Sequence, residues 1–350
     1  MNRHDLTETI LAYARQLGFT LAGVTVPGKM TSFHTFAQWV NDGNAAGMAY
    51  LERPDTLAKR ANSQLILPDA RSILVVGLPY FSHAEQPNVV KNPGNGKVAA
   101  YARGLDYHAV IPVKLAQLVE KVETWIGRPI AHRVYTDTGP ILEREMAVMA
   151  GLGWIGKNSC LISPQFGSYF LLAELFLDLD LEPAQALVTD HCGSCNRCVQ
   201  SCPTHCIQPD RTILAQRCIS FQTIENRAEM DQAVAEMAAD WLFGCDICQN
   251  VCPWNIRFSH TPPDVQLEIK PGSETVDAIE ILLTSPAVLK EKYKTSPLLR
   301  SKPAGLYRNA INVLNNSKSL PPQMIEKISL VNQEAAMIIS KMTNQTIDRQ

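Results

Sequence analysis

Two stretches of the chain hold most of its cysteines, CGSCNRCVQSCP (residues 192–203) and CDICQNVCP (residues 245–253). Nine of the ten cysteines lie between Cys192 and Cys252, and Cys160 stands alone as an expected buried residue. The first stretch has the spacing of bacterial ferredoxins, in which three thiolates hold one [4Fe–4S] cluster and the fourth crosses to a second cluster. The spacing therefore predicts a module with two [4Fe–4S] clusters.

The second stretch is the same motif without its first cysteine, since position 242 is a leucine. The crossover rule assigns Cys252 to the first cluster. The first cluster is then held by Cys192, Cys195, Cys198 and Cys252, and the second by Cys202, Cys245, Cys248 and one more thiolate. Cys206 and Cys218 are both candidates for that place. We favour Cys218, because Cys206 follows Cys202 by only four residues and Cys218 can approach from another direction.

Zinc is the alternative metal for this module, because paired CxxC units also bind zinc. A zinc site needs neither four cysteines in the first stretch nor a proline after each last cysteine. A bare electron carrier is a second alternative, but it leaves the long segments before and after the module unexplained.

Length and composition narrow the class of protein further. At roughly 100–200 residues per domain, 350 residues predict two or three domains. A hydrophobic content of 46% excludes a disordered chain, and a net charge of −2 limits any nucleic-acid site to a local patch. No apolar run is long enough for a membrane span, and the charged N-terminal stretch resembles an amphipathic helix rather than a signal. We expect a cytoplasmic protein without membrane contact.

The predicted fold class is α+β in three parts. Residues 1–183 form an N-terminal α/β domain, residues 184–258 the two-cluster ferredoxin-like module, and residues 259–350 a linker (259–274) followed by a helical, HEAT-like region. Apolar runs predict strands at 19–26, 72–78 and 131–136. Helical spacing predicts helices at 33–40, 56–61, 107–126 and 140–150, and residues 160–163 and 168–176 are expected to form a hairpin.

Gly151-Leu-Gly153-Trp-Ile-Gly156 spells the GxGxxG dinucleotide fingerprint. That fingerprint requires a strand before it and a helix after it. Here a helical stretch precedes it and Lys-Asn-Ser-Cys-Leu-Ile-Ser follows. We therefore interpret it as a glycine-rich turn that lets the backbone approach a flat cofactor closely.

Asp137, in Thr-Asp-Thr-Gly-Pro, has two readings. An aspartate before Gly-Pro is typical of a turn. A carboxyl beside an apolar cofactor would instead have a raised pKa and could donate a proton. The residues alone do not decide between them. Tyr107 and His108, at an expected helix start, are assigned a structural role.

The segment from Val288 to Lys318 is locally basic. It holds Lys290, Lys292, Lys294, Arg300, Lys302, Arg308 and Lys318 against the single acid Glu291, with Asn309, Asn312, Asn315 and Asn316 as further donors. It is either a solvated helix face or a phosphate-binding surface, for which we select Arg300, Lys302 and Arg308 as RNA contacts.

Taken together, these motifs resemble the epoxyqueuosine reductase family. The segments that carry the resemblance run through most of the chain: LPDARSILVVGLPY (67–80), ARGLDYHAV (102–110), Asp137 with GPILEREMAVMAGLGWIGKNSCLI (139–162), CGSCNRCVQSCPTHCI (192–207), RCISFQTIE (217–225) and GCDICQNVCPWN (244–255). The resemblance implies reduction of epoxyqueuosine to queuosine at the wobble position of tRNA. It implies two [4Fe–4S] clusters, cobalamin in the N-terminal domain and an external low-potential electron donor.

The resemblance also implies roles for single residues. Cys218 becomes the missing cluster ligand and Asp137 the proton donor, and Cys206 becomes a spare thiol. Arg60, Leu161 and Leu172 are placed around the corrin, and Ser220, Cys245 and Asp246 on its cluster side. The cobalt is expected to be base-off without a protein ligand, and the region after Asn309 is short for the family. A related corrinoid iron–sulfur reductase acting on a small molecule, such as a reductive dehalogenase, is the alternative.

Overall fold

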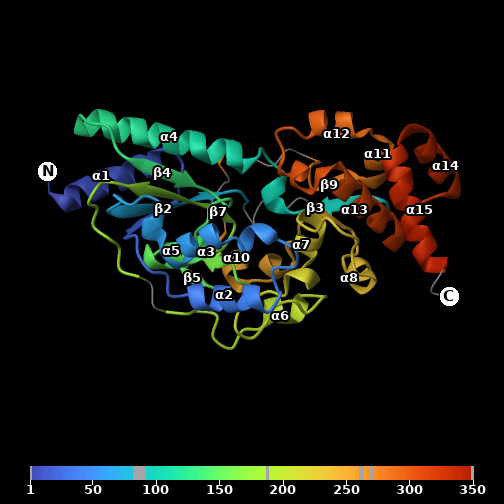
Figure 1. Cartoon of the computed structure of the whole chain (residues 1–350), viewed down its shortest axis with the longest axis horizontal. Coiled ribbons are helices and arrows are strands. Elements are labelled where there is room, and N and C mark those ends of the chain that lie inside the picture. Colours follow the sequence, from blue (N-terminus) through green and yellow to red (C-terminus); the bar gives the residue numbers. More distant parts are fainter. Residues whose placement is uncertain are drawn as a thin grey trace.

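A four-stranded antiparallel sheet organises the N-terminal half of the chain (Figure 1). The structure is a computed structural model that describes residues 2–81, 92–186, 189–259, 264–265, 267 and 272–347. The strand order is β1 (Leu21–Thr25), β2 (Ser72–Pro79), β7 (Phe170–Leu177) and β4 (His132–Tyr135). Strand β2 is buried along its whole length, which explains its unbroken apolar sequence.

Helices cover both faces of this sheet. Helices α1 (Arg3–Gln16) and α4 (Tyr107–Ile126) pack on the face that carries Leu74 and Val76, and α5 (Glu143–Met149) packs on the face that carries Ile73 and Val75 (Figure 1). Asp106 caps α4 by accepting a hydrogen bond from the His108 backbone N–H, and Gly127 ends it in a left-handed conformation. Helices α2 (Phe33–Asn41) and α3 (Pro54–Ala61) lie between β1 and β2 in the chain.

The strands predicted at 19–26, 72–78 and 131–136 are confirmed as β1, β2 and β4, and the helix at 107–126 is confirmed as α4. The helices predicted at 33–40, 56–61 and 140–150 form as α2, α3 and the shorter α5. Of the hairpin predicted between 160–163 and 168–176, only the turn forms, as an antiparallel bridge between Ser163 and Gly167, and the pairing of the two strands is wrong. Strand β6 (Leu161–Ile162) pairs with β5 (Trp154–Ile155), and β7 enters the main sheet between β2 and β4. The long apolar β7 needs cover on both faces, which a two-stranded hairpin does not provide.

The glycine-rich turn leads into this small hairpin. No helix follows Gly151, which adopts φ +75°, because β5 begins at Trp154. A side chain on Gly153 would meet the Ile162 carbonyl oxygen at 2.1 Å. The glycines therefore serve a tight turn, as the sequence indicated, and also a close approach between two strands; the expected approach to a flat cofactor stays a prediction.

A second sheet joins distant parts of the chain. Strand β3 (Asn95–Val98) lies between β8 (Trp241–Phe243) and β9 (Thr275–Asp277). Val98, Leu242 and Phe243 share a core with the C-terminal helices. The segment around β3 thus ties the N-terminal half to the cysteine region and to the C-terminal helices. The domain boundaries after residues 183 and 258 stay a prediction.

Short helices make up the cysteine region, namely α6 (Arg197–Ser201), α7 (Ile219–Ile224), α8 (Gln232–Met237), α9 (Ile247–Asn250) and α10 (Pro253–Phe258). The C-terminal helices are α11 (Ala278–Leu283), α12 (Pro286–Lys292), α13 (Lys302–Asn316), α14 (Pro322–Val331) and α15 (Gln333–Ile347), with a 3₁₀ turn at Pro297–Ser301. They form one end of the molecule (Figure 1). Proline stands in the first turn of α12, α13 and α14, where its missing N–H costs nothing.

Most of the linker predicted at 259–274 lies outside the described residues. Within the described part of the chain, no helix combines the length and the apolar character that crossing a bilayer would take.

Candidate active site

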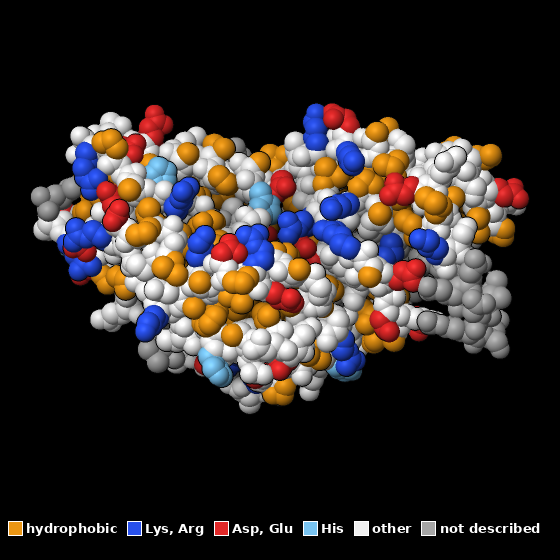
Figure 2. All heavy atoms as spheres, viewed as in Figure 1, with side chains coloured by type: hydrophobic (Ala, Val, Ile, Leu, Met, Phe, Trp, Pro, Cys, Tyr) orange, Lys and Arg blue, Asp and Glu red, His pale blue; other side chains and the backbone are white. Residues whose placement is uncertain are grey.

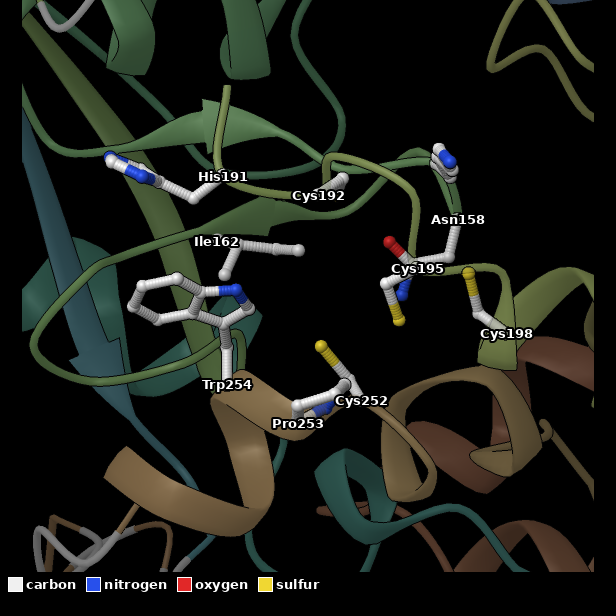
Figure 3. Close-up of a pocket in the computed structure, with 10 residues that line it drawn as sticks. Asn158, Ile162, His191, Cys192, Cys195, Cys198, Cys252, Pro253 and Trp254 are labelled. Atoms are coloured by element: carbon white, nitrogen blue, oxygen red, sulfur yellow. The ribbon is translucent and has the colours of Figure 1, made fainter. Parts of the chain in front are cut away.

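The first three cysteines and the last one meet at one pocket. We call Cys192, Cys195, Cys198 and Cys252 the outer cysteine set, and all four line this pocket. Figure 3 shows the sulfurs of Cys195, Cys198 and Cys252 pointing toward one another, with Trp254 and Ile162 beside them. The Trp154 indole N–H donates to the Cys192 sulfur (3.5 Å). The structure thus gathers the four thiols that the crossover rule grouped.

The remaining module cysteines lie deeper in the fold. We call Cys202, Cys218, Cys245 and Cys248 the inner cysteine set. Cys202 and Cys206 are buried side by side with their sulfurs 3.5 Å apart, and Cys218 and Cys248 pack against the same cluster. Burial raises the pKa of the Cys248 thiol well above its usual range. Both candidates for the last ligand, Cys206 and Cys218, therefore stand at this position.

A run of buried and half-buried residues lies between the inner set and Asp137. We call these residues, Asp246, Ala100, Tyr101 and Tyr107, the wall. Asp246, 3% exposed, accepts a hydrogen bond from the Ala100 backbone N–H (2.7 Å), and burial raises the pKa of its carboxyl to about 6. The pKa of Tyr101 is raised by burial and by the charges of both Asp137 and Asp246. Tyr101 therefore lies within electrostatic reach of both carboxyls, and its ring contacts Tyr107 at 6.2 Å between centroids.

Asp137 is paired with a histidine. His108 Nε2 lies 3.4 Å from Asp137 Oδ2, and His108 Nδ1 lies 2.8 Å from Asp106 Oδ1. Burial lowers the pKa of His108, but its hydrogen bonds and charge interactions with Asp106 and Asp137 outweigh this and raise the pKa to about 9. His108 is therefore a cation at neutral pH, held between two carboxylates. Its assignment to a purely structural role was incomplete.

The electrostatics of Asp137 are set by its charged neighbours. The sequence argument tied a raised pKa to an apolar cofactor beside the carboxyl, and that stays a prediction. In this structure burial does push the pKa upward, but hydrogen bonds from His108 and Tyr107 and the charges of His108 and Arg300 outweigh it and lower the pKa. The side chain is 56% exposed. The proton shared by this pair therefore resides on His108 in the protein without cofactor or substrate.

The backbone around Asp137 is constrained. Asp137 adopts φ +59°, a conformation that costs a non-glycine residue roughly 1 kcal/mol or more. Its backbone N–H donates to Glu143 Oε1 (2.6 Å), and the Thr136 hydroxyl donates to the Leu172 carbonyl (2.8 Å). We call residues 136–139 the Asp137 loop. Its position is fixed by these two hydrogen bonds, one to Glu143 of α5 and one to Leu172 of β7.

The residues expected around a corrin lie on several elements near this loop. Leu161 is buried in β6, and Leu172 in β7 contacts the loop through its carbonyl. Arg60 is 7% exposed, its guanidinium lies 5.3 Å from the centre of the Phe36 ring, and its Nη1 has no hydrogen-bond partner among the described residues. A buried donor without a partner is costly unless a ligand meets it. The amide groups on a corrin rim are suitable acceptors, so this part of the site fits the cofactor. Ser220, at the start of α7, is half-buried.

The structure corrects one of the RNA contacts predicted in the basic segment from Val288 to Lys318. Arg308 is 7% exposed and donates to the backbone carbonyls of Gln222, Asn226 and Ala228. Asn309 and Asn312 are also buried and bond to backbone carbonyls. Arg308 is therefore a structural residue that ties α13 to α7, and the prediction that it contacts RNA is wrong. Counting charges along the chain does not reveal which guanidinium faces inward.

Arg300 and Lys302 are exposed. Arg300 Nε pairs with Glu225 Oε1 (2.6 Å), and its charge contributes to lowering the pKa of Asp137. Arg300 thus lies near the Asp137 loop, although it is distant in sequence. Figure 2 shows lysine and arginine side chains along the middle of one face, interspersed with acidic ones.

The sequence reasoning gave no site role to three charged residues near Asp137: Glu143, Glu174 and His108, the last of which it assigned a structural role. The Asp106-x-His108 spacing at a helix start was an available signal, since a capping aspartate holds a histidine two residues later. Glu174 was a second signal, because it is the lone charge in the apolar stretch SYFLLAELF.

Comparison with known proteins agrees with this arrangement. A family model described as a 4Fe–4S double cluster binding domain matches residues 191–255. A model described as epoxyqueuosine reductase QueG, DUF1730, matches residues 60–138. The first match favours iron–sulfur clusters over zinc in the cysteine module.

Similar proteins cover nearly the whole chain. The epoxyqueuosine reductase of Synechocystis sp. is 38% identical over 78% of this chain and 91% of its own length. That of Pseudomonas aeruginosa is 31% identical over 91% of this chain and 87% of its own. The solved structure of epoxyqueuosine reductase from Streptococcus thermophilus superimposes with a TM-score of 0.81 at 30% identity, over 91% of this chain and 83% of that one.

A crystal structure of an epoxyqueuosine reductase with an epoxyqueuosine-modified tRNA-Tyr stem loop superimposes with a TM-score of 0.83 at 28% identity, over 93% of this chain and 84% of that one. These matches show that the chain is an oxidoreductase. The alternative of a bare electron carrier is therefore set aside. On its sequence and its fold, the chain belongs to the epoxyqueuosine reductase family.

Proposed function

We propose that this protein reduces epoxyqueuosine to queuosine in tRNA, with cobalamin and two [4Fe–4S] clusters as cofactors and Asp137 as proton donor. Removal of the epoxide oxygen as water leaves an alkene and consumes two electrons and two protons. The observation that carries the proposal is the placement of Asp137. It stands at an exposed edge of the fold, within electrostatic reach of a wall that leads to the inner cysteine set.

The outer set would hold one cluster and the inner set the other, with Cys218 as the last inner ligand. Arg60, Leu161 and Leu172 would hold the corrin on one side, and Ser220, Cys245 and Asp246 on the cluster side. When bound, cobalamin supplies the strongly reducing chemistry needed to open the epoxide, and the clusters supply single electrons from an external low-potential donor.

The proton is delivered by the chain itself. His108 carries a proton at neutral pH because Asp106 and Asp137 surround it. Once substrate covers the loop, water leaves and the ion pair of Asp137 with His108 is destabilised in favour of neutral partners. The proton then moves from His108 to Asp137, which passes it to the departing oxygen. Solvent then protonates the pair again, and this supplies the second proton with which the oxygen leaves as water. Tyr107 stacks on the His108 ring with 4.1 Å between centroids and keeps it in place.

The RNA is expected to lie over the Asp137 loop with the modified base turned into the site. Arg300 and Lys302 are the exposed cations that we assign to phosphate contacts. The tRNA stem loop bound by the relative described above supports this kind of substrate.

Anaerobic reconstitution tests the proposal. The protein is loaded with iron, sulfide and cobalamin, supplied with a chemical reductant, and incubated with tRNA that carries epoxyqueuosine. Nucleoside mass spectrometry should then show queuosine, and leaving out either cobalamin or iron should abolish it. Queuosine formed without cobalamin would overturn the cofactor assignment. A fully loaded protein that leaves the epoxide intact would overturn the reaction.

A further inference from the structure

Two glutamates lie behind the Asp137 loop and play no part in the reaction described above. Glu143, the first residue of α5, accepts the Asp137 backbone N–H at 2.6 Å. Glu174 lies in the middle of β7 and is fully buried. The strand register places it between Val75 of β2 and Tyr135 of β4, on the sheet face that α5 covers.

The surroundings of Glu174 are unfavourable for a negative charge. Neither carboxyl oxygen has a hydrogen-bond partner of good geometry among the described residues, and apolar side chains dominate this face of the sheet. Burial raises the pKa of Glu174 well above its usual range, and the neighbouring Glu143 raises it further. Burial and the charge of Asp137 also raise the pKa of Glu143, to about 7. Two carboxylates in one buried site do not both ionise near neutrality.

We propose that Glu143 and Glu174 share one proton at neutral pH, and that this carboxyl pair, fully buried at Glu174 and half-buried at Glu143, holds the Asp137 loop in its working position. The importance of that position rests on the proposed function of Asp137. Both glutamates are positioning residues, since neither is placed against substrate or cofactor.

The carboxyl pair holds the loop through a single hydrogen bond, which the Asp137 backbone N–H donates to Glu143. With the shared proton on Glu174, Glu143 keeps one negative charge, which makes it a strong acceptor for the Asp137 N–H. That bond supports the left-handed backbone of Asp137. When the shared proton is lost at alkaline pH, two negative charges meet at a largely buried position. Movement of the Glu143 side chain toward solvent relieves the repulsion and releases the loop.

Other ionisable groups surround the pair from each neighbouring element. They are Arg60 of α3, Tyr107 of α4, Tyr135 of β4, Asp137 of the loop and Arg144 of α5. Arg144 favours the charged form of Glu143, and Asp137 opposes it. Glu174 is fully buried and neither of its oxygens has a hydrogen-bond partner of good geometry among the described residues, so the proton is best retained there.

Amide hydrogen exchange at Asp137 in the cofactor-loaded protein tests the proposal without turnover. In the wild type, protection corrected for intrinsic exchange should hold at neutral pH and fall tenfold or more as the pair loses its proton. Glu174→Gln supplies a neutral donor that cannot ionise, so protection should persist into alkaline pH. Glu143→Ala removes the acceptor and should abolish protection at every pH. Glu145→Gln is the matched control, because Glu145 lies on the same helix but bonds Thr31 and Ser32.

Infrared difference spectra provide a second readout. The wild type should show a protonated carboxyl near neutral pH that disappears in Glu174→Gln. Absence of this band, or Asp137 protection in Glu143→Ala and Glu174→Gln that matches the wild type at all pH values, would overturn the proposal. Neither readout uses tRNA. A protein that fails to reduce epoxyqueuosine can therefore still show the carboxyl pair, and the two failures are distinguishable.

Discussion

The outer and inner cysteine sets differ in their surroundings. Cys192 and Cys195 sit on a loop whose neighbours His191, Gly193 and Ser194 are exposed, next to a surface pocket. Cys245 of the inner set is flanked by the buried Gly244 and Asp246. The inner set also borders the buried residues that lead to Asp137 through Asp246 and Ala100. The difference favours the direction of electron flow that we propose, with entry from solvent at the outer set and delivery to the site from the inner set.

The largest expected effect separates the two candidate ligands of the inner set. Cys218→Ala should lose one cluster, so that iron falls from about eight to about four per chain and turnover disappears. Cys206→Ala should keep the iron, although its sulfur lies 3.5 Å from that of Cys202. Iron analysis and electron paramagnetic resonance of the reduced proteins measure both. Iron loss in Cys206→Ala together with retention in Cys218→Ala would reverse our assignment.

Arg308→Ala should weaken the inner set specifically. Its guanidinium satisfies three backbone carbonyls, one of them in α7, which begins directly after Cys218. Removing a buried charged donor that leaves such partners unsatisfied costs roughly 2–4 kcal/mol. Denaturant unfolding should show this loss, and the inner cluster should be released at lower denaturant than the outer one. A variant with wild-type stability would show that Arg308 is not structural.

Exposure to a chelator should distinguish the two sets in the wild type. The outer cluster, next to the surface pocket, is expected to lose iron several-fold faster than the inner one. Following the signals of the two clusters during anaerobic incubation with chelator measures this order. Faster loss from the inner set would contradict the proposed direction of electron flow.

Charge reversal of Arg300 and Lys302 should have the smallest effect on the clusters. Both residues are exposed, so iron content should stay unchanged, and loss of the exposed ion pair of Arg300 with Glu225 should lower stability by no more than about 1 kcal/mol. The affinity for tRNA should fall, and the slope of log affinity against log salt should flatten by roughly 1–2, as expected when two phosphate contacts are lost. Binding measured across a salt series tests this. An unchanged slope would make these residues a solvated surface only.

How much of the fold and of the site could be predicted from the sequence depends on whether the signal is local or depends on distant segments. Cysteine spacing is local and groups three thiols of the outer set, and the crossover rule for paired ferredoxin motifs adds Cys252. The burial of Arg308 depends on α7 and the loop after it, and no charge count along the chain contains that information. Likewise β7 reads as a hairpin strand until β2 and β4 are seen on either side of it. The pairing of His108 with Asp137 joins a helix start to a distant loop.

The most direct test of the account compares the wild type with Asp137→Asn. Both are fully loaded with clusters and cobalamin, and conversion of epoxyqueuosine to queuosine in tRNA is followed in single turnover. The wild type should convert its substrate, and Asp137→Asn should slow by about a hundredfold or more, because asparagine has no proton to transfer. Iron, cobalamin and tRNA binding should remain unchanged. Near-normal conversion by the fully loaded Asp137→Asn protein would contradict the role of Asp137 as proton donor.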